Sequence, residues 1–101
     1  MAQKLGRDDI DARLGSLPGW TLADAKLRRE FKFPDFVEAI GFMTRAAIEA
    51  EKMNHHPEWF NVYNKVVVEL TTHSAGGITE LDFELAGKLN LLASDSNPVR
   101  D

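Results

Sequence analysis

The run from Lys65 to Thr72 restricts the fold more than any other part of this 101-residue chain. β-Branched residues dominate the run, and such residues favour strands over helices. Successive side chains of a strand point to opposite faces, so Val66, Val68 and Leu70 are expected together on one apolar face. Such a face has to be covered, and the chain is therefore expected to fold around a sheet with helices packed against it.

Two hairpins are predicted to build that sheet. Residues 20–23 are expected to form a short strand, followed by a turn at Asp24-Ala25 and a second strand over residues 27–33. Residues 59–63 are expected to pair with residues 65–72 across a break at Asn64-Lys65. Hairpins favour an antiparallel sheet. An unprotected edge, expected at residues 65–72 or 20–23, would favour pairing with a second copy of the chain.

Helix signals lie on both sides of the hairpins. Residues 8–14 carry acids in their first turn and are followed by Gly15, which is typical of a short helix. Asp35 and Glu38 resemble a capping box that opens a long helix ending near Lys52. The stripe expected to face the core of this helix comprises Phe36, Ile40, Met43, Ala47 and Ala50, widened by Val37, Thr44 and Ile48.

The last helix is expected to open at Thr79, with Asp82 as its capping partner. Its apolar seam consists of Leu81, Leu85, Leu89 and Leu92. The predicted order is therefore αββαββα. We expect one α+β domain over residues 1–101, in which three helices pack on one face of a four-stranded antiparallel sheet.

Composition excludes several classes of function. Sixteen acidic and twelve basic residues give a net charge of −4, whereas a duplex-binding surface usually needs the opposite balance, so no direct nucleic-acid partner is expected. The chain has no cysteine, which removes disulfides, thiolate nucleophiles and Cys-ligated zinc. No apolar stretch approaches the ~20 residues that span a bilayer, and the N-terminus lacks the apolar run of a signal peptide. A soluble cytoplasmic protein without a membrane partner is expected.

The three histidines, His55, His56 and His73, fall within nineteen residues. Histidine titrates nearest neutral pH and is the usual general acid or base. Two of them end the long helix and the third ends a strand, so a hairpin that pairs residues 59–63 with 65–72 would allow them to form one site. The plainer interpretation is a polar helix exit. A zinc site is the other alternative, but adjacent histidines are poor joint ligands and no HExxH pattern is present, so no metal is expected.

Three other residues have both a structural and a functional interpretation. Glu51 precedes His55 by four residues and would share its helix face, or it is simply a solvated carboxylate. Asp82 caps the last helix and can also orient a histidine. Trp59 either packs in the core or forms the wall of a site for a flat ligand.

Together these residues resemble the pterin-4a-carbinolamine dehydratase family, also called the dimerisation cofactor family. The family signature is Glu, three residues, His-His-Pro, five residues, an aromatic, nine residues, His, eight or more residues, and Asp. Every spacing is satisfied by Glu51, His55-His56-Pro57, Tyr63, His73 and Asp82. The resemblance covers residues 20–93 well, and residues 1–19 only by the order of the elements.

The resemblance implies loss of water from 4a-hydroxytetrahydropterin to give quinonoid dihydropterin, a reaction that recycles pterin for an aromatic amino-acid hydroxylase. It implies no cofactor, because the pterin is the substrate. It also implies homodimers joined at sheet edges, often paired into homotetramers through helices. His55, His56 and His73 would be the acid–base set, with proton transfer favoured at His56 and His73. Substrate-binding roles would fall to Glu51, Pro57, Trp59 and Asp82.

The rival function from another class is a protein-interaction module, which the same family also implies. In that case the fold would bind a partner's helices. The intact histidines favour the enzyme, because helix binding requires none of them.

Overall fold

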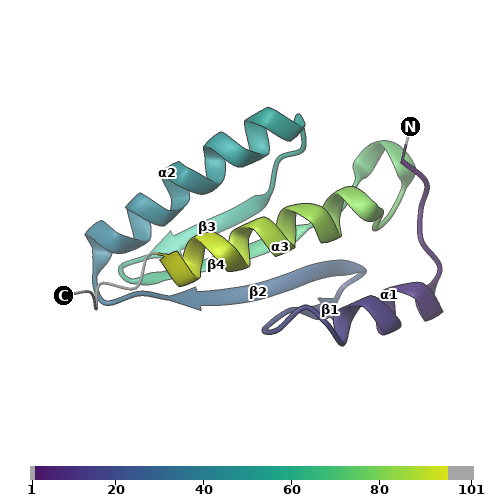
Figure 1. The fold of residues 1–101 in the computed structure, drawn as a ribbon, viewed down its shortest axis with the longest axis horizontal. Coiled ribbons are helices and arrows are strands. Elements are labelled where there is room, and N and C mark those ends of the chain that lie inside the picture. Colours follow the sequence, from purple (N-terminus) through teal and green to yellow (C-terminus); the bar gives the residue numbers. More distant parts are fainter. Residues whose placement is uncertain (1, 96–101) are drawn as a thin grey trace.

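The run that begins at Lys65 forms an inner strand of a four-stranded antiparallel sheet in the computed structural model, which describes residues 2–95. The strand order is β1-β2-β4-β3. The strands are β1 (Thr21–Ala23), β2 (Lys26–Lys32), β3 (Glu58–Val62) and β4 (Lys65–Leu70). The helices are α1 (Arg7–Leu14), α2 (Phe36–Met53) and α3 (Glu80–Asp95), with a 3₁₀ helix, η1 (His73–Ala75), before α3 (Figure 1). The predicted order αββαββα and the α+β class are confirmed.

The position of β4 corrects one expectation. Residues 65–72 were expected as a possible edge, but β4 pairs with β2 on one side, where Leu70 faces Leu27, and with β3 on the other. The edges are β1 and β3. Val67 points away from the helices yet is only 3% exposed. Apolar residues on both faces of a strand are typical of an inner strand, which is the signal in this run that an edge assignment overlooks.

Two tight turns set the register of the hairpins. Asp24 and Ala25 have φ values of 51° and 63°, the left-handed conformation that a two-residue type I′ turn requires. The turn between β3 and β4 is Tyr63-Asn64, one residue earlier than predicted, because Val62 faces Lys65 in the ladder. The Asn64 side-chain amide donates to the Phe33 carbonyl oxygen at 2.9 Å, which connects this turn to the end of β2.

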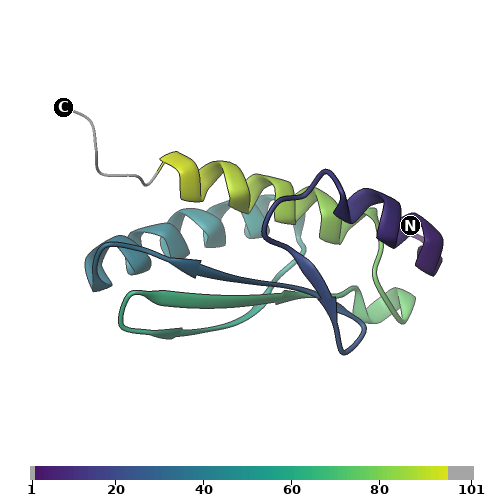
Figure 2. The same ribbon diagram turned by 90° about the horizontal axis from the view of Figure 1, so that it is seen from below.

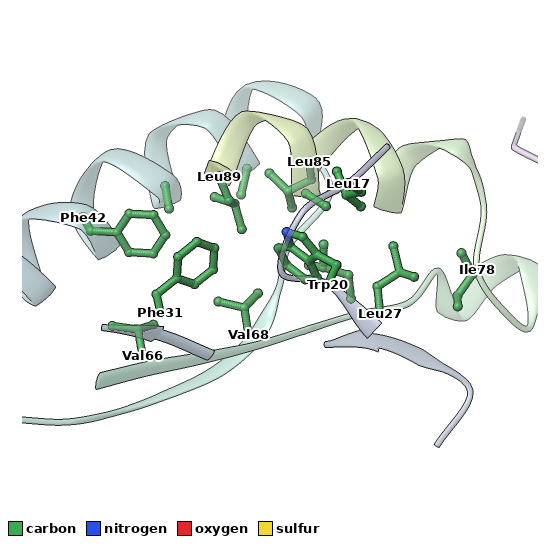
Figure 3. Packing of buried hydrophobic residues seen from close by; sticks show 14 of the residues in the cluster. Leu17, Trp20, Leu27, Phe31, Phe42, Val66, Val68, Ile78, Leu85 and Leu89 are labelled. Carbon is green, nitrogen blue, oxygen red and sulfur yellow. The ribbon is translucent and has the colours of Figure 1, made fainter. Parts of the chain in front are cut away.

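All three helices lie on the same face of the sheet, as Figure 2 shows. The core lies between the two layers, where side chains of β2, β4, α2 and α3 point toward one another (Figure 3). The fully buried Phe42 ring packs against two other phenylalanines, with ring centroids 4.8 Å from Phe31 and 4.9 Å from Phe33. Within residues 2–95, no helix is both long and apolar enough to cross a membrane.

The face of α2 that packs on the core differs from the predicted one. The buried residues are Ala39, Phe42, Ala46 and Ala50, and of the predicted stripe only Ala50 is among them, with Met43 partly buried. Phe36, Val37, Ile40 and Ile48 are 49%, 74%, 40% and 55% exposed. Alanines let the helix lie close to its neighbours, so the side with the most small residues packs inward and the bulkier aliphatic side stays outside. We call the exposed set Phe36, Val37, Ile40 and Ile48 the apolar face of α2.

The two phenylalanines of α2 provide a direct test of this orientation. Phe42→Ala is expected to lower the free energy of unfolding by about 4 kcal/mol, because it opens a cavity in a closed aromatic cluster. Phe36→Ala, six residues earlier on the exposed side, is expected to cost about 1 kcal/mol or less. Urea unfolding of both variants measures the difference. A larger loss in Phe36→Ala than in Phe42→Ala would mean that α2 packs through the face predicted from its sequence.

Candidate active site

The His-His-Pro corner is formed where α2 ends. Asn54 adopts the left-handed conformation at φ 52°, and the backbone N–H of His55 donates to the Ala50 carbonyl oxygen at 3.0 Å, which closes the helix. Pro57 then disfavours helical geometry at His56, so the chain extends directly into β3. The end of α2, the start of β3 and the loop before α3 lie at the same end of the molecule (Figure 1).

His55 is buried and paired with Asp82. Its Nε2 lies 2.6 Å from Asp82 Oδ1, and the two side chains are 9% and 0% exposed. An ionised carboxylate has no hydrogen to donate, so the ring nitrogen that faces it carries the proton. In the neutral ring, Nδ1 of His55 is therefore the free acceptor.

Asp82 is satisfied by two further elements. Its Oδ2 accepts from the Thr72 hydroxyl and from the Thr79 backbone N–H, each at 2.8 Å. Because Thr72 gives its hydrogen to Asp82, the 2.8 Å contact between the two threonine hydroxyls requires Thr79 as its donor. The Thr79 hydroxyl also accepts from the Leu81 N–H at 3.2 Å. The predicted capping pair of α3 is thus confirmed, and the same carboxylate binds His55.

His56 and His73 are exposed and have their own carboxylates. His56 Nε2 lies 2.8 Å from Glu51 Oε1, with side chains 56% and 80% exposed. His73 Nε2 lies 2.9 Å from Glu58 Oε2, and His73 is 77% exposed. Each of the three histidines therefore directs Nε2 at a different carboxylate and leaves Nδ1 as the acceptor of its neutral form. We call these pairs the three dyads.

Glu58 has a second partner. Its other oxygen, Oε1, accepts from the Lys26 ammonium, which stands at the start of β2. The hydrogen bond from Lys26, followed by the one from His73, lowers the pKa of the Glu58 carboxyl, and the bond to Glu58 raises the pKa of Lys26. Glu58 therefore stays ionised at a lower pH than an isolated glutamate.

The structure brings most of the predicted site residues to this corner. Asp82 contacts His55 directly, and Thr72, the neighbour of His73, contacts Asp82. Glu58, two residues after His56, contacts His73. His73 is thus connected to the His55-His56 corner through Glu58, two residues after His56, and through its neighbour Thr72, which contacts Asp82.

Trp59 lies on the other side of β3 from Glu58. It faces Val68 in the ladder and packs, partly buried, against the core. Its structural interpretation therefore holds, although Trp59 is not fully buried. Among residues 2–95, no three His, Asp or Glu side chains gather closely enough to hold one metal ion.

Three residues of this corner were not singled out in the sequence: Glu58, Lys26 and Thr72. Glu58 follows the His-His-Pro run directly, so its proximity to His56 was visible. Its contacts with Lys26 and His73 depend on the strand order, because Lys26 belongs to β2 and His73 follows β4. Spacing along the chain carries no signal for such cross-strand contacts.

Comparison with known proteins identifies the same family that the histidine signature resembles. The family described as Pterin 4 alpha carbinolamine dehydratase matches residues 3–92. The chain belongs to this family. A dehydratase is a lyase, so the family is one of enzymes, as the sequence predicted.

Individual relatives cover nearly the whole chain. A protein of Solibacter usitatus, provisionally named pterin-4-alpha-carbinolamine dehydratase, is 56% identical over 94 residues, which are 93% of this chain and 99% of the relative. A similarly named protein of Prochlorococcus marinus is 54% identical over 90% of this chain and 95% of its own length. The crystal structure of a transcriptional coactivator/pterin dehydratase from Brucella melitensis is 48% identical, with a TM-score of 0.88, and covers 90% of this chain and 99% of that one.

The Asp82 network predicts a large loss of stability on truncation. Asp82→Ala leaves three buried donors, from Thr72, Thr79 and His55, without an acceptor, and is expected to lower the free energy of unfolding by about 3 kcal/mol. The control is Glu84→Ala on the exposed side of the same helix, where loss of the pair with Lys88 is expected to cost less than about 0.5 kcal/mol. Urea unfolding compares the two, and similar losses would show that the network contributes no more than a surface ion pair.

Proposed function

We propose that this protein is a pterin-4a-carbinolamine dehydratase that removes water from 4a-hydroxytetrahydropterin by histidine acid–base catalysis. The observation that carries the proposal is the set of three dyads at one corner of a chain that belongs to this family. Pairing with a carboxylate keeps an imidazole in one tautomer and orientation, and it stabilises the charged ring once a proton has been taken up.

The reaction needs one proton donor and one proton acceptor. The lone pair of the ring nitrogen next to C4a forms a C=N bond while the C–O bond breaks. The hydroxyl group leaves as water with a proton from the acid, and the nitrogen loses its own proton to the base. One proton enters, one leaves and no electrons are gained or lost, so the proposed reaction requires no oxidant, reductant or organic cofactor.

The exposure of the histidines divides their roles. His56 and His73 are open to solvent and can exchange protons with a bound substrate and with water. His55 is enclosed by its pair with Asp82, so we assign it to substrate binding and to the shape of the corner, with its Nδ1 as the available atom. General acid–base catalysis contributes roughly 100- to 10,000-fold per group.

The remaining predicted residues would surround the pterin. Glu51 orients His56, Pro57 keeps the corner extended, and the exposed part of Trp59 would lie against the flat ring. Asp82 would act through His55. The substrate would come from an aromatic amino-acid hydroxylase, and the product would return to it, with recycling in the cytoplasm.

Replacement of the exposed histidines tests this assignment. His56→Ala and His73→Ala are each expected to lower the rate of dehydration of chemically generated 4a-hydroxytetrahydropterin by about 100-fold or more, with unfolding midpoints near the wild-type value. Stopped-flow absorbance measures the rate. Near-native turnover in both variants would refute the catalytic assignment, whatever the fate of the fold.

A second proposal concerns assembly. We propose that the protein forms homodimers or homotetramers through the apolar face of α2 and through a sheet edge. Four large apolar side chains on one helix are unusual for a face in contact with water. Beside Ile48 the surface is hollowed by about 520 Å³, lined by Thr44, Ala47, Ile48, Glu51 and Lys52. The same face could instead bind a partner's helices, and the Brucella relative is titled a transcriptional coactivator as well as a pterin dehydratase.

Charge introduced on this face distinguishes the two uses. Val37→Glu combined with Ile48→Glu is expected to reduce the molar mass of the purified protein in light scattering, because burial of two carboxylates in a helix interface is costly. Leu91→Glu, an exposed leucine of α3, is the matched control and is expected to leave the mass unchanged. If the wild type is already a monomer at high concentration, self-assembly is refuted and binding of another protein's helices is favoured.

A further inference from the structure

Glu58 contacts two nitrogen-bearing side chains, His73 and Lys26, from elements that are distant in the sequence. Oε2 faces His73 Nε2 at 2.9 Å and Oε1 accepts from Lys26. Glu58 is the first residue of β3, and β4 separates β3 from β2 in the sheet. Its carboxylate thus connects η1, which follows β4, with the first residue of β2. Exposed ion pairs add little to stability, so the main consequence of this arrangement is the placement of the side chains it joins.

His73 has few other contacts that could fix its orientation. It begins a 3₁₀ helix of three residues that ends at Gly76 in the left-handed conformation, and its imidazole is 77% exposed. Among residues 2–95, Glu58 is the hydrogen-bond partner found for the ring. Without Glu58, both χ angles of His73 and the choice of tautomer would be open.

We propose that Glu58 is a positioning residue for His73, and that Lys26 in turn holds Glu58 in place. This inference rests on the dehydratase function proposed above and assigns to it two residues outside the histidine signature. Glu58 accepts the hydrogen of Nε2, which fixes the tautomer with Nδ1 unprotonated and turned toward solvent, where a substrate can meet it. Lys26 occupies the other oxygen, so the carboxylate cannot turn away.

The surrounding charges agree with this role. The negative charges of Glu69 in β4 and Asp24 in the preceding turn also raise the pKa of Lys26. Glu69 is itself paired with Arg28 at 3.7 Å. Lys26 and His73 are the groups that lower the pKa of Glu58. The carboxyl therefore stays ionised, and so a pure acceptor, at a lower pH than an isolated glutamate, as a group that fixes a tautomer must.

The first test reads the tautomer without reference to activity. Nitrogen-15 shifts of the His73 ring, at a pH where the imidazole is neutral, are expected to show the Nε2–H form in the wild type and a mixture of both forms in Glu58→Ala. Glu58→Gln keeps an acceptor oxygen and is expected to retain much of the wild-type signal. Glu30→Ala removes another outer-face carboxylate, paired with Lys65 at 3.2 Å, and serves as the control that should leave His73 unchanged.

The second test separates positioning from binding. Glu58→Ala is expected to lower kcat by about 10-fold, the lower range for groups that orient a functional histidine, with KM near its wild-type value. Glu58→Gln should recover part of the loss. Lys26→Met is expected to lower kcat less than Glu58→Ala and to raise the titration midpoint of the Glu58 carboxyl, whereas Lys65→Met should do neither.

The two failures are distinguishable. An unchanged His73 tautomer and an unchanged kcat in Glu58→Ala would overturn the positioning role while leaving the dehydratase intact. If His73→Ala itself retains full turnover, the catalytic function proposed for His73 fails, even where the tautomer depends on Glu58.

Discussion

The buried carboxylate of Asp82 is the interaction on which the corner depends. It accepts hydrogen bonds from His55, two residues after α2, from Thr72, two residues after β4, and from Thr79, which opens α3. A charge enclosed in this way is tolerated only when its acceptor sites are filled, so each of the three segments must arrive in register for the others to be stable. The fold and the site are therefore specified by the same atoms.

Much of this architecture could be predicted from local signals. These signals are short-range features with short-range physical causes: the β-branched run, the Asp24-Ala25 turn, the caps at Asp35 and Thr79, and the end of α2 before Pro57. The inner position of β4 is different, because it depends on which hairpin edge meets β2. An apolar residue at position 67, on the outer face of the strand, was the signal for an inner strand. An argument from the alternation of side chains alone does not use that signal.

The face of α2 and the details of the site show the limit of periodicity. A helix with alanines on one side and large apolar residues on the other offers two apolar sides that could face the core. Close packing against α3 and the sheet favours the side with the alanines. Likewise, the histidine signature located the corner but not its internal pairing. Neither the burial of His55 nor the contact of His73 with Glu58 follows from spacing, because the first depends on where Asp82 of α3 packs and the second on strand order.

Glu51 belongs to two surfaces at once. It lines the hollow beside Ile48 on α2, and it is the carboxylate that His56 faces. A molecule seated on that helix would therefore touch the side chain that orients an imidazole. If copies of the chain assemble through that helix as proposed, the specific activity would change with the protein concentration, because Glu51 is shared by the two surfaces.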